Sequence, residues 1–240
     1  MKKDDVYAAP LQEVSDFSFD ARVADVFENM INRSVPGYAF MLDLIGVVST
    51  RYARPGTNCY DLGCSLGAST LMIRHHVPAG CHVIGIDNSV AMVERCRANV
   101  SRDHSEASVD IRQESIQETQ FSNASVVVLN FTLQFIPPAE RQQLLCDIHT
   151  GMIPGGALIL AEKVSLSEEE AGASITSLHE DFKRYQGYSD LEIAQKRTAL
   201  ENVMIPDSIA THRRRLAQAG FTQTAELSRC LNFASLLAIA

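Results

Sequence analysis

The chain has 240 residues, 46% of them hydrophobic, which is enough to bury one sizeable α/β core with added helices but makes a second independent core unexpected. Its formal net charge of -8 and its pI near 5.4 argue against a broadly basic surface for nucleic acid.

Neither the cysteines nor the N-terminal sequence points to export, a metal or a membrane. The six cysteines form no C-x-x-C pair and no histidine stands at zinc-finger spacing, so we expect buried thiols and no metal site. The first residues lead into polar sequence, and no run of about 18 apolar residues occurs. We therefore expect a cytoplasmic protein without membrane contact.

Two helices are predicted ahead of the first strand. An apolar periodic stretch begins at Asp20 and is interrupted at residues 34–37, and a second helix should span residues 38–52. We expect residues 1–55 to form a helical cover over the rest of the single domain.

Strands and helices then alternate, which is typical of a parallel sheet. The predicted elements are strand 59–62, helix 68–76, strand 82–87, helix 89–100 with Ser89 as its N-cap, strand 109–112, strand 125–130, a helix from Pro137 through His149, and strand 157–162. The run 125–130 is apolar without alternation, as expected for a central strand covered on both faces.

The C-terminal part contains an insertion and a hairpin. Residues 165–206 are charged and helical in pattern and too long for an ordinary connection, so we expect a functional helical insertion. A helix over 208–219, in which residues 213–215 form a solvated arginine face, should stop at Gly220. Strands 221–227 and 231–239, joined by residues 228–230, predict an antiparallel hairpin. The predicted fold class is thus α/β, with a Rossmann-like, mostly parallel seven-stranded sheet.

The most informative motif is YDLGCSLG at residues 60–67, which places an acid and two glycines at a strand end. Glycine lets the backbone turn there without a side chain blocking a ligand. A second strand ends at Asp87, whose carboxylate can accept both hydroxyls of a ribose. Gly63 and Gly67 alone would be explained by a tight turn, but with Asp61 and Asp87 in register they predict a nucleoside-binding crevice.

The spacing of this motif differs from the dinucleotide fingerprint G-x-G-x-x-G. The middle glycine is absent, and Asp61 adds negative charge where a phosphate would be unfavourable. A carboxylate there suits a cation such as the ammonium of a methionine moiety. These residues therefore favour S-adenosylmethionine over a nicotinamide dinucleotide.

Several segments together resemble one family, the carboxy-S-adenosyl-L-methionine synthases, which are related by fold to class I S-adenosylmethionine-dependent methyltransferases. The segments are residues 33–38, 60–67, 86–89, 123–125, 129–135, 195–197 and 200–204. The motifs around Gly63 and Asp87 occur in many methyltransferases, whereas residues 33–38, 130–135 and 196–204 are far more restrictive.

The resemblance implies an enzyme that converts S-adenosyl-L-methionine and prephenate to carboxy-S-adenosyl-L-methionine and phenylpyruvate. Its product would feed the 5-oxyacetic acid modification of wobble uridine in tRNA. The resemblance also implies a homodimer, with the insertion as a contact surface. Because the chain is acidic, we do not expect it to bind tRNA itself.

The resemblance assigns site residues one by one. Those implied to contact the cofactor are Tyr38, Gly63, Cys64, Ser65, Asp87, Asn88, Ser115, Ile116 and Asn130. Arg197 is implied to act as the catalytic residue that holds the added carboxylate, which a planar guanidinium fork matches. Without the family context, Arg197 would be interpreted as a surface ion pair. The family usually has aspartate at the position of Ser115, so we expect weaker cofactor binding here.

The implied reaction decarboxylates and aromatises prephenate while a sulfonium ylide captures the carbon dioxide, which requires a site closed to water. No protein base stands out. His179 is a candidate by residue type, but a lone histidine on a charged helix predicts a solvated surface group. Weaker candidates than Arg197 for holding the carboxylates of prephenate are Lys163, Lys183, Arg184 and Lys196.

Two other functions remain open at this point. A conventional small-molecule methyltransferase would use the same crevice but transfer the methyl group directly. A non-catalytic nucleoside-binding module, or an assembly partner of a tRNA-modifying enzyme, would bind the nucleoside without chemistry.

Overall fold

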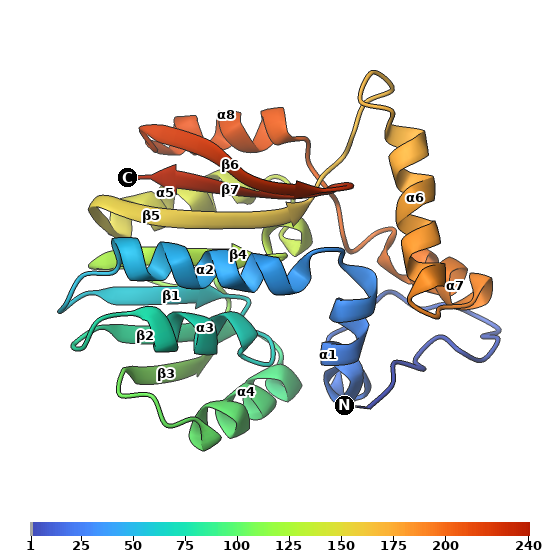
Figure 1. Cartoon of the computed structure of the whole chain (residues 1–240), viewed down its shortest axis with the longest axis horizontal. Helices are drawn as coiled ribbons and strands as arrows, with labels where there is room; N and C mark the ends of the chain where they lie inside the picture. The colour runs from blue at the N-terminus through green and yellow to red at the C-terminus, as the bar shows by residue number, and fades with distance from the viewer. Residues whose placement is uncertain (1) are drawn as a thin grey trace.

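A computed structural model describes residues 2–240, and its centre is a seven-stranded sheet in the order β3-β2-β1-β4-β5-β7-β6 (Figure 1). The strands are β1 (Asn58–Leu62), β2 (His82–Asp87), β3 (Ser108–Gln113), β4 (Ala124–Asn130), β5 (Met152–Lys163), β6 (Gln223–Cys230) and β7 (Phe233–Ile239). The first five strands run parallel, and β7 is antiparallel to both β5 and β6. The predicted fold class is confirmed.

The helices form two layers and one group at the sheet's end. They are α1 (Ala21–Ser34), α2 (Tyr38–Tyr52), α3 (Ala68–His76), α4 (Val90–Arg102), α5 (Arg141–Gly151), α6 (Gly172–Tyr185), α7 (Asp190–Leu200) and α8 (Ile209–Ala219), with a short 3-10 turn η1 (Leu133–Phe135). In Figure 1, α2 and α3 cover one face of the sheet and α5 and α8 the other. Helices α1, α6 and α7 lie beyond the carboxyl ends of the parallel strands.

The central strand β4 shows why these layers form. Val126 and Val128 pack against the α2 and α3 side, whereas Val127 and Leu129 pack against α5 and α8. All four side chains are fully buried, because successive side chains of a strand point to opposite faces and both faces are covered. The prediction of a central strand from an unbroken apolar run is confirmed.

The N-terminal segment before α1 is bound to α7 rather than to the sheet. The side-chain amide of Gln195 donates to the carbonyls of Tyr7 and Ala9, at 2.9 and 3.0 Å. The Phe17 N–H donates to the Ala199 carbonyl at 2.8 Å. This segment therefore crosses the same end of the molecule as α1, α6 and α7.

Several boundary predictions are tested by this structure. The N-cap at Ser89 is confirmed, since its side chain accepts from the Met92 N–H. The hairpin is confirmed but its predicted link at residues 228–230 is wrong: β6 continues to Cys230, and the turn is at Leu231, which adopts a left-handed φ of 53°. Helix α5 begins at Arg141 rather than at Pro137, which instead starts a turn closed by Glu140.

The predictions for cysteines and arginines are correct in part. Cys59, Cys64, Cys81 and Cys96 are buried, Cys146 is half-buried, and Cys230 is exposed because β6 is an edge strand. Of the arginine triplet on α8, Arg213 and Arg214 are exposed, but Arg215 turns inward to Asp207. No helix within residues 2–240 is long and apolar enough to cross a bilayer.

Candidate functional site

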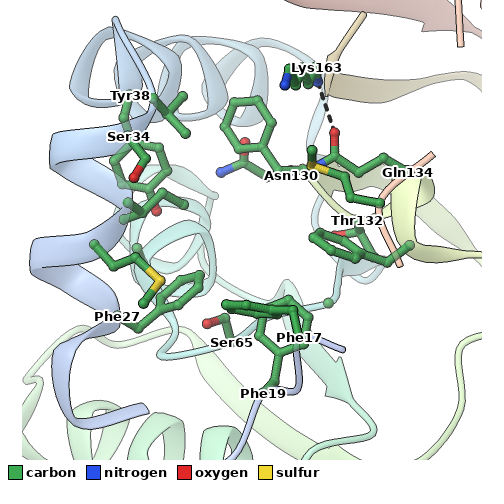
Figure 2. Close-up of a pocket in the computed structure, with 18 of the residues that line it drawn as sticks. Phe17, Phe19, Phe27, Ser34, Tyr38, Ser65, Asn130, Thr132, Gln134 and Lys163 are labelled. Carbon is green, nitrogen blue, oxygen red and sulfur yellow. Dashed lines mark hydrogen bonds between the residues drawn. The ribbon is translucent and has the colours of Figure 1, made fainter. Parts of the chain in front are cut away.

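A cavity of about 1180 Å³ opens at the carboxyl ends of β1, β2 and β4 and extends beneath α1, α6 and α7. Figure 2 shows Tyr38, Ser65, Asn130 and Lys163 arranged around it. Pockets for one small ligand usually measure about 300–1,000 Å³, so this cavity has room for two small molecules.

The turn after β1 forms the floor on one side. The N–H groups of Gly63 and Cys64 both donate to the Ile86 carbonyl, at 2.8 and 2.9 Å, and so tie this turn to β2. Gly63 and Gly67 adopt φ of 78° and 89°. A Cβ on Gly63 would lie 2.4 Å from Thr132 Oγ1, and one on Gly67 would lie 2.8 Å from Cys96 Sγ. These glycines are therefore required by left-handed backbone and close packing as well as by any ligand.

Asp87 ends β2 and lines the cavity beside the exposed Asn88. Its two carboxylate oxygens each accept a backbone N–H at 2.9 Å, one from Ser65 and one from Ser89. Burial raises the pKa of Asp87, and these two hydrogen bonds oppose that rise. The carboxylate is thus held in one orientation, with lone pairs left for a ligand.

Asp61 lies just below the cavity floor, 1% exposed and not among the lining residues. The Thr70 hydroxyl donates to its Oδ2 at 2.6 Å. Burial and, to a lesser extent, the charge of the nearby Asp87 raise the pKa of Asp61 to about 7, although the hydrogen bond from Thr70 opposes that rise. The sequence predicted that a carboxylate here suits a cationic ligand, and in this arrangement Asp61 can act on such a ligand only through its charge.

The loop after β4 supplies the opposite wall. Asn130 donates its amide to Ser69 Oγ at 3.0 Å, while its Oδ1 is buried and has no hydrogen-bond partner in the described structure. Thr132 Oγ1 donates to the Leu62 carbonyl at 2.8 Å, which fixes the loop against β1. Asn130 thus presents a free acceptor next to the turn that Asp61 and Gly63 begin.

A network of buried acidic and basic side chains holds this loop against β5 and α5. The Leu133 and Gln134 N–H groups donate to Glu162 at 2.8 and 3.0 Å. The fully buried Arg141 donates to the Ile136 and Gln134 carbonyls and also pairs with Asp207. Burial raises the pKa of Glu162 to about 8. Sequence reasoning missed this network, because nothing in a mixed helical pattern marks Arg141 as buried.

The segment after β3 differs from what the resemblance implies. Ile116 is buried and lines the cavity, and so does Gln117. Ser115 is not a lining residue, and its hydroxyl instead donates to Gln117 Oε1 at 2.8 Å. Gln117, which the sequence did not single out, is the polar side chain at this wall.

The far end of the cavity carries positive charge. Lys163 from β5, Lys183 from α6 and Lys196 from α7 all line it. Arg184, a further sequence candidate, does not: it is exposed and pairs with Asp181 and Asp190. The structure therefore brings three of the four lysine and arginine candidates together.

Arg197 lies at the rim of this positive end. Its guanidinium donates to Glu180 Oε1 at 2.9 Å, and 70% of its side chain is exposed. Arg197 also lines the cavity, as does Glu180. A carboxylate from the protein thus occupies the fork that the resemblance assigns to a carboxylate of the ligand.

His179 is not the solvated group that the sequence predicted. It is 4% exposed, its Nε2 donates to the Ser34 carbonyl at 2.8 Å, and its ring packs edge-on to Phe233 with centroids 4.9 Å apart. Burial and, to a lesser extent, the charge of Lys183 lower its pKa to about 3. His179 is therefore neutral and a weak base. The prediction failed because His179 packs on Phe233 and bonds Ser34, both far away in the sequence, and no local pattern indicates these contacts.

Aromatic side chains from the N-terminal segment complete the enclosure. Phe17 and Phe19 line the cavity opposite Asn130, as Figure 2 shows. Phe19 packs edge-on to Phe135 with centroids 5.1 Å apart. Sequence reasoning missed these residues, although two phenylalanines in an otherwise polar stretch were an available signal.

Solved structures share this fold. A family model for a methyltransferase domain matches residues 60–156. Human N-acetylserotonin methyltransferase, solved in complex with SAM, superposes with a TM-score of 0.62 at 16% identity, over 91% of this chain and 55% of that one. A cyclopropane synthase from Mycobacterium tuberculosis gives 0.60 at 14% identity, over 78% and 63%. The fold is thus that of the class I methyltransferase-like proteins.

Sequence comparison identifies the family within this class. The carboxy-S-adenosyl-L-methionine synthase of Yersinia enterocolitica is 48% identical over 99% of this chain and 90% of its own length. The protein of the same name from Yersinia pestis is 49% identical over the same shares. The chain belongs to the carboxy-S-adenosyl-L-methionine synthase family.

The close approach of Gly63 to Thr132 yields a stability prediction. Gly63→Ala should destabilise the protein by roughly 2–4 kcal/mol, because it adds both left-handed strain and a clash. Thr132→Ala should cost only about 0.5–1.5 kcal/mol through its lost hydrogen bond. The double variant should lose less stability than the two single variants lose together, since the clash is relieved. Urea unfolding measures all three, and strict additivity would contradict the proposed packing.

Proposed function

We propose that this protein makes carboxy-S-adenosyl-L-methionine and phenylpyruvate from S-adenosyl-L-methionine and prephenate. The observation that carries the proposal is the charge division of one cavity, with Asp61 and Asp87 at the strand ends and lysines with Arg197 at the far end. A sulfonium nucleoside is a cation and prephenate is a dianion. The cavity therefore offers each substrate a complementary end.

The nucleoside end fits an adenosine. The Asp87 carboxylate, oriented by Ser65 and Ser89, would accept the ribose hydroxyls, with Asn88 beside it. Ile116 would form an apolar wall for the adenine, and Gln117 would supply the polar contact that Ser115 is too remote to make. Gly63 and Cys64 would leave backbone groups facing the methionine portion.

The methionine portion would lie between Tyr38 and Asn130. The unpaired Oδ1 of Asn130 would accept a hydrogen from the ammonium group, and the charge of Asp61 beneath the floor favours any cation there. Tyr38 packs near Phe131, with centroids 6.3 Å apart, and burial raises the pKa of Tyr38, so it would act as a neutral donor.

Arg197 would hold the carboxylate that the cofactor gains. The guanidinium now pairs with Glu180, so a carboxylate on the cofactor would replace one that the protein already supplies. Binding of product would thus exchange one carboxylate partner of Arg197 for another. This exchange would favour the carboxylated cofactor over S-adenosyl-L-methionine.

The proposed reaction balances without any external oxidant or reductant. In prephenate the bond between the ring and its carboxyl group breaks, the electron pair makes the ring aromatic, and the ring hydroxyl leaves. The departing hydroxide takes a proton from the sulfonium methyl and becomes water. The resulting carbanion forms a carbon–carbon bond to the carbon dioxide. The low pKa of His179 makes it a poor base, which supports a base supplied by the substrate.

The enclosure supports chemistry that water would interrupt. The N-terminal segment brings Phe17 and Phe19 over the cavity and is bound to α7 through Gln195. Prephenate and the cofactor would meet between this cover and the strand ends. Water exclusion keeps the carbanion from being protonated before it meets carbon dioxide.

The proposed pathway, cellular location and oligomeric state follow from the family resemblance. The product would supply wobble uridine modification in tRNA in the cytoplasm, and the net charge of -8 favours a protein that does not hold tRNA itself. A homodimer would have α6 as a contact surface, which is supported by the exposure of Leu178 and Tyr185, at 51% and 88%.

Mass spectrometry of the cofactor tests the proposed function. The protein is incubated with S-adenosyl-L-methionine, with and without prephenate. A carboxylated cofactor that forms only with prephenate is the expected result. Methyl transfer to a small molecule without that product would favour a conventional methyltransferase instead.

Replacing Arg197 should change the preference between the two cofactors. Arg197→Ala should weaken carboxy-S-adenosyl-L-methionine binding about 10- to 100-fold, since hydrogen bonds between charged groups are lost, and leave S-adenosyl-L-methionine binding nearly unchanged. Arg184→Ala is the matched control, because Arg184 also faces Glu180 but lies outside the cavity. Calorimetric titration measures both affinities, and an unchanged preference in Arg197→Ala would rule out its role.

Asp61 should make cofactor binding depend on pH. Since its pKa in the free protein is about 7, it is mostly protonated at pH 6 and mostly ionised at pH 8. S-adenosyl-L-methionine affinity should therefore rise about tenfold between these values. The neutral isostere Asp61→Asn should remove this rise, and an equal rise in that variant would contradict the assignment.

The raised pKa of Asp61 also affects the stability of the free protein, which should fall with rising pH where the affinity for the cofactor rises. The folded free protein binds the Asp61 proton more tightly than the unfolded chain does. Its stability should accordingly fall as pH rises from about 4 to about 7, and a bound cation should offset that fall.

A further inference from the structure

The three lysines at the far end of the cavity come from separate parts of the fold. Lys163 ends β5, Lys183 lies in the last turn of α6, and Lys196 lies in the second half of α7, just before Arg197 in its last turn. All three line the cavity and are only partly exposed. Three elements therefore converge to bring ammonium groups to one wall, an arrangement that no local helical pattern requires.

These ammonium groups have little compensation from the protein. Lys196 Nζ donates to Ser34 Oγ at 3.1 Å and lies 4.0 Å from Asp4. Within residues 2–240, neither Lys163 nor Lys183 has a carboxylate within ion-pair distance; Glu180, which pairs with Arg197, opposes the fall of both pKa values only through its charge. Desolvated charges without partners are unfavourable, so this wall is suited to an incoming anion.

The lowered pKa values of the three lysines reflect the same unfavourable burial of positive charge. The pKa of Lys183 is lowered to about 8 by burial and by the charge of Lys163. The pKa of Lys196 is also lowered to about 8, by burial first and by Lys183 in part. Burial lowers the pKa of Lys163 as well. An anion bound among them would raise all three values.

The surroundings indicate what kind of anion fits. Phe131 and Phe233 line the cavity next to the lysines and pack edge-on, with centroids 5.9 Å apart. Three ammonium groups next to an apolar wall match a ring or chain that carries two negative groups. A single carboxylate would leave part of the positive charge uncompensated.

We propose that Lys163, Lys183 and Lys196 form the binding site for the two carboxylates of a dicarboxylate second substrate. Arg197 is separate from this site and serves the carboxylate that the cofactor gains. The inference rests on the proposed function for the identity of the dianion, but its binding step can be measured without turnover.

The test is calorimetric titration of prephenate into the protein saturated with S-adenosylhomocysteine, which has no methyl group to carboxylate. Lys183→Gln and Lys163→Gln should each weaken prephenate binding about 10- to 100-fold and leave S-adenosylhomocysteine binding unchanged. Lys183→Arg should restore part of the affinity. Arg184→Gln, a neighbour on the same helix that lies outside the cavity, should bind prephenate as the unaltered protein does.

A proton-linked readout separates an anion site from a merely structural role. Near pH 8, prephenate binding should take up protons because it raises the lysine pKa values, and affinity should fall as pH rises through about 8. Lys183→Gln should reduce this uptake, which titration in buffers of different ionisation enthalpy measures. The charged and titratable groups facing the lysines are Asp4, Arg33, His179, Glu180, Glu192 and Arg197.

The outcomes separate this inference from the proposed function. If the lysine variants bind prephenate as tightly as the unaltered protein, or lose S-adenosylhomocysteine equally, the inference is wrong even where turnover succeeds. If prephenate binds through the lysines but no carboxylated cofactor forms, the inference stands and the proposed function fails. If prephenate does not bind the unaltered protein at all, the inference is wrong.

Discussion

The site depends on one constraint of parallel sheets, namely where the strand order reverses. From β1 the chain continues to β2 on one side, while β4 is followed by β5 on the other, so the loops after β1 and β4 diverge and leave a crevice between them. Gly63 and Thr132 stand on the two sides of this crevice and touch at its base. Two backbone N–H groups hold the Asp87 carboxylate and the Leu62 carbonyl holds the Thr132 hydroxyl, which gives these two side chains fixed positions.

Charge is distributed along the cavity in a way that fits two ligands of opposite sign. Burial raises the pKa of Asp61 and of Asp87, and the charge of Asp87 adds to the rise at Asp61, whereas burial lowers the pKa of Lys183 and of Lys196. The charged groups at each end are therefore energetically unfavourable while no ligand of opposite charge is bound. Bound together, a cation and a dianion would relieve both ends and also attract one another, which orders them for reaction.

The sequence predicted what depends on local periodicity and backbone chemistry. The strand β4, the N-cap at Ser89 and the C-terminal hairpin follow from apolar patterning and turn residues, and they are confirmed. The sequence did not predict what depends on packing between distant segments. His179 is buried because its ring packs on Phe233 and bonds the Ser34 carbonyl, and Arg141 is buried because it holds the carbonyls of the η1 loop. Neither contact leaves a signal in neighbouring residues.

The central claim is that carbon dioxide passes from one ligand to the other inside a single cavity. It is tested by supplying prephenate labelled with ¹³C in its ring carboxyl group, together with S-adenosyl-L-methionine and unlabelled bicarbonate, and weighing the carboxylated cofactor. A product that carries the label without dilution is predicted. A product whose label is diluted by the bicarbonate in solution would contradict the claim.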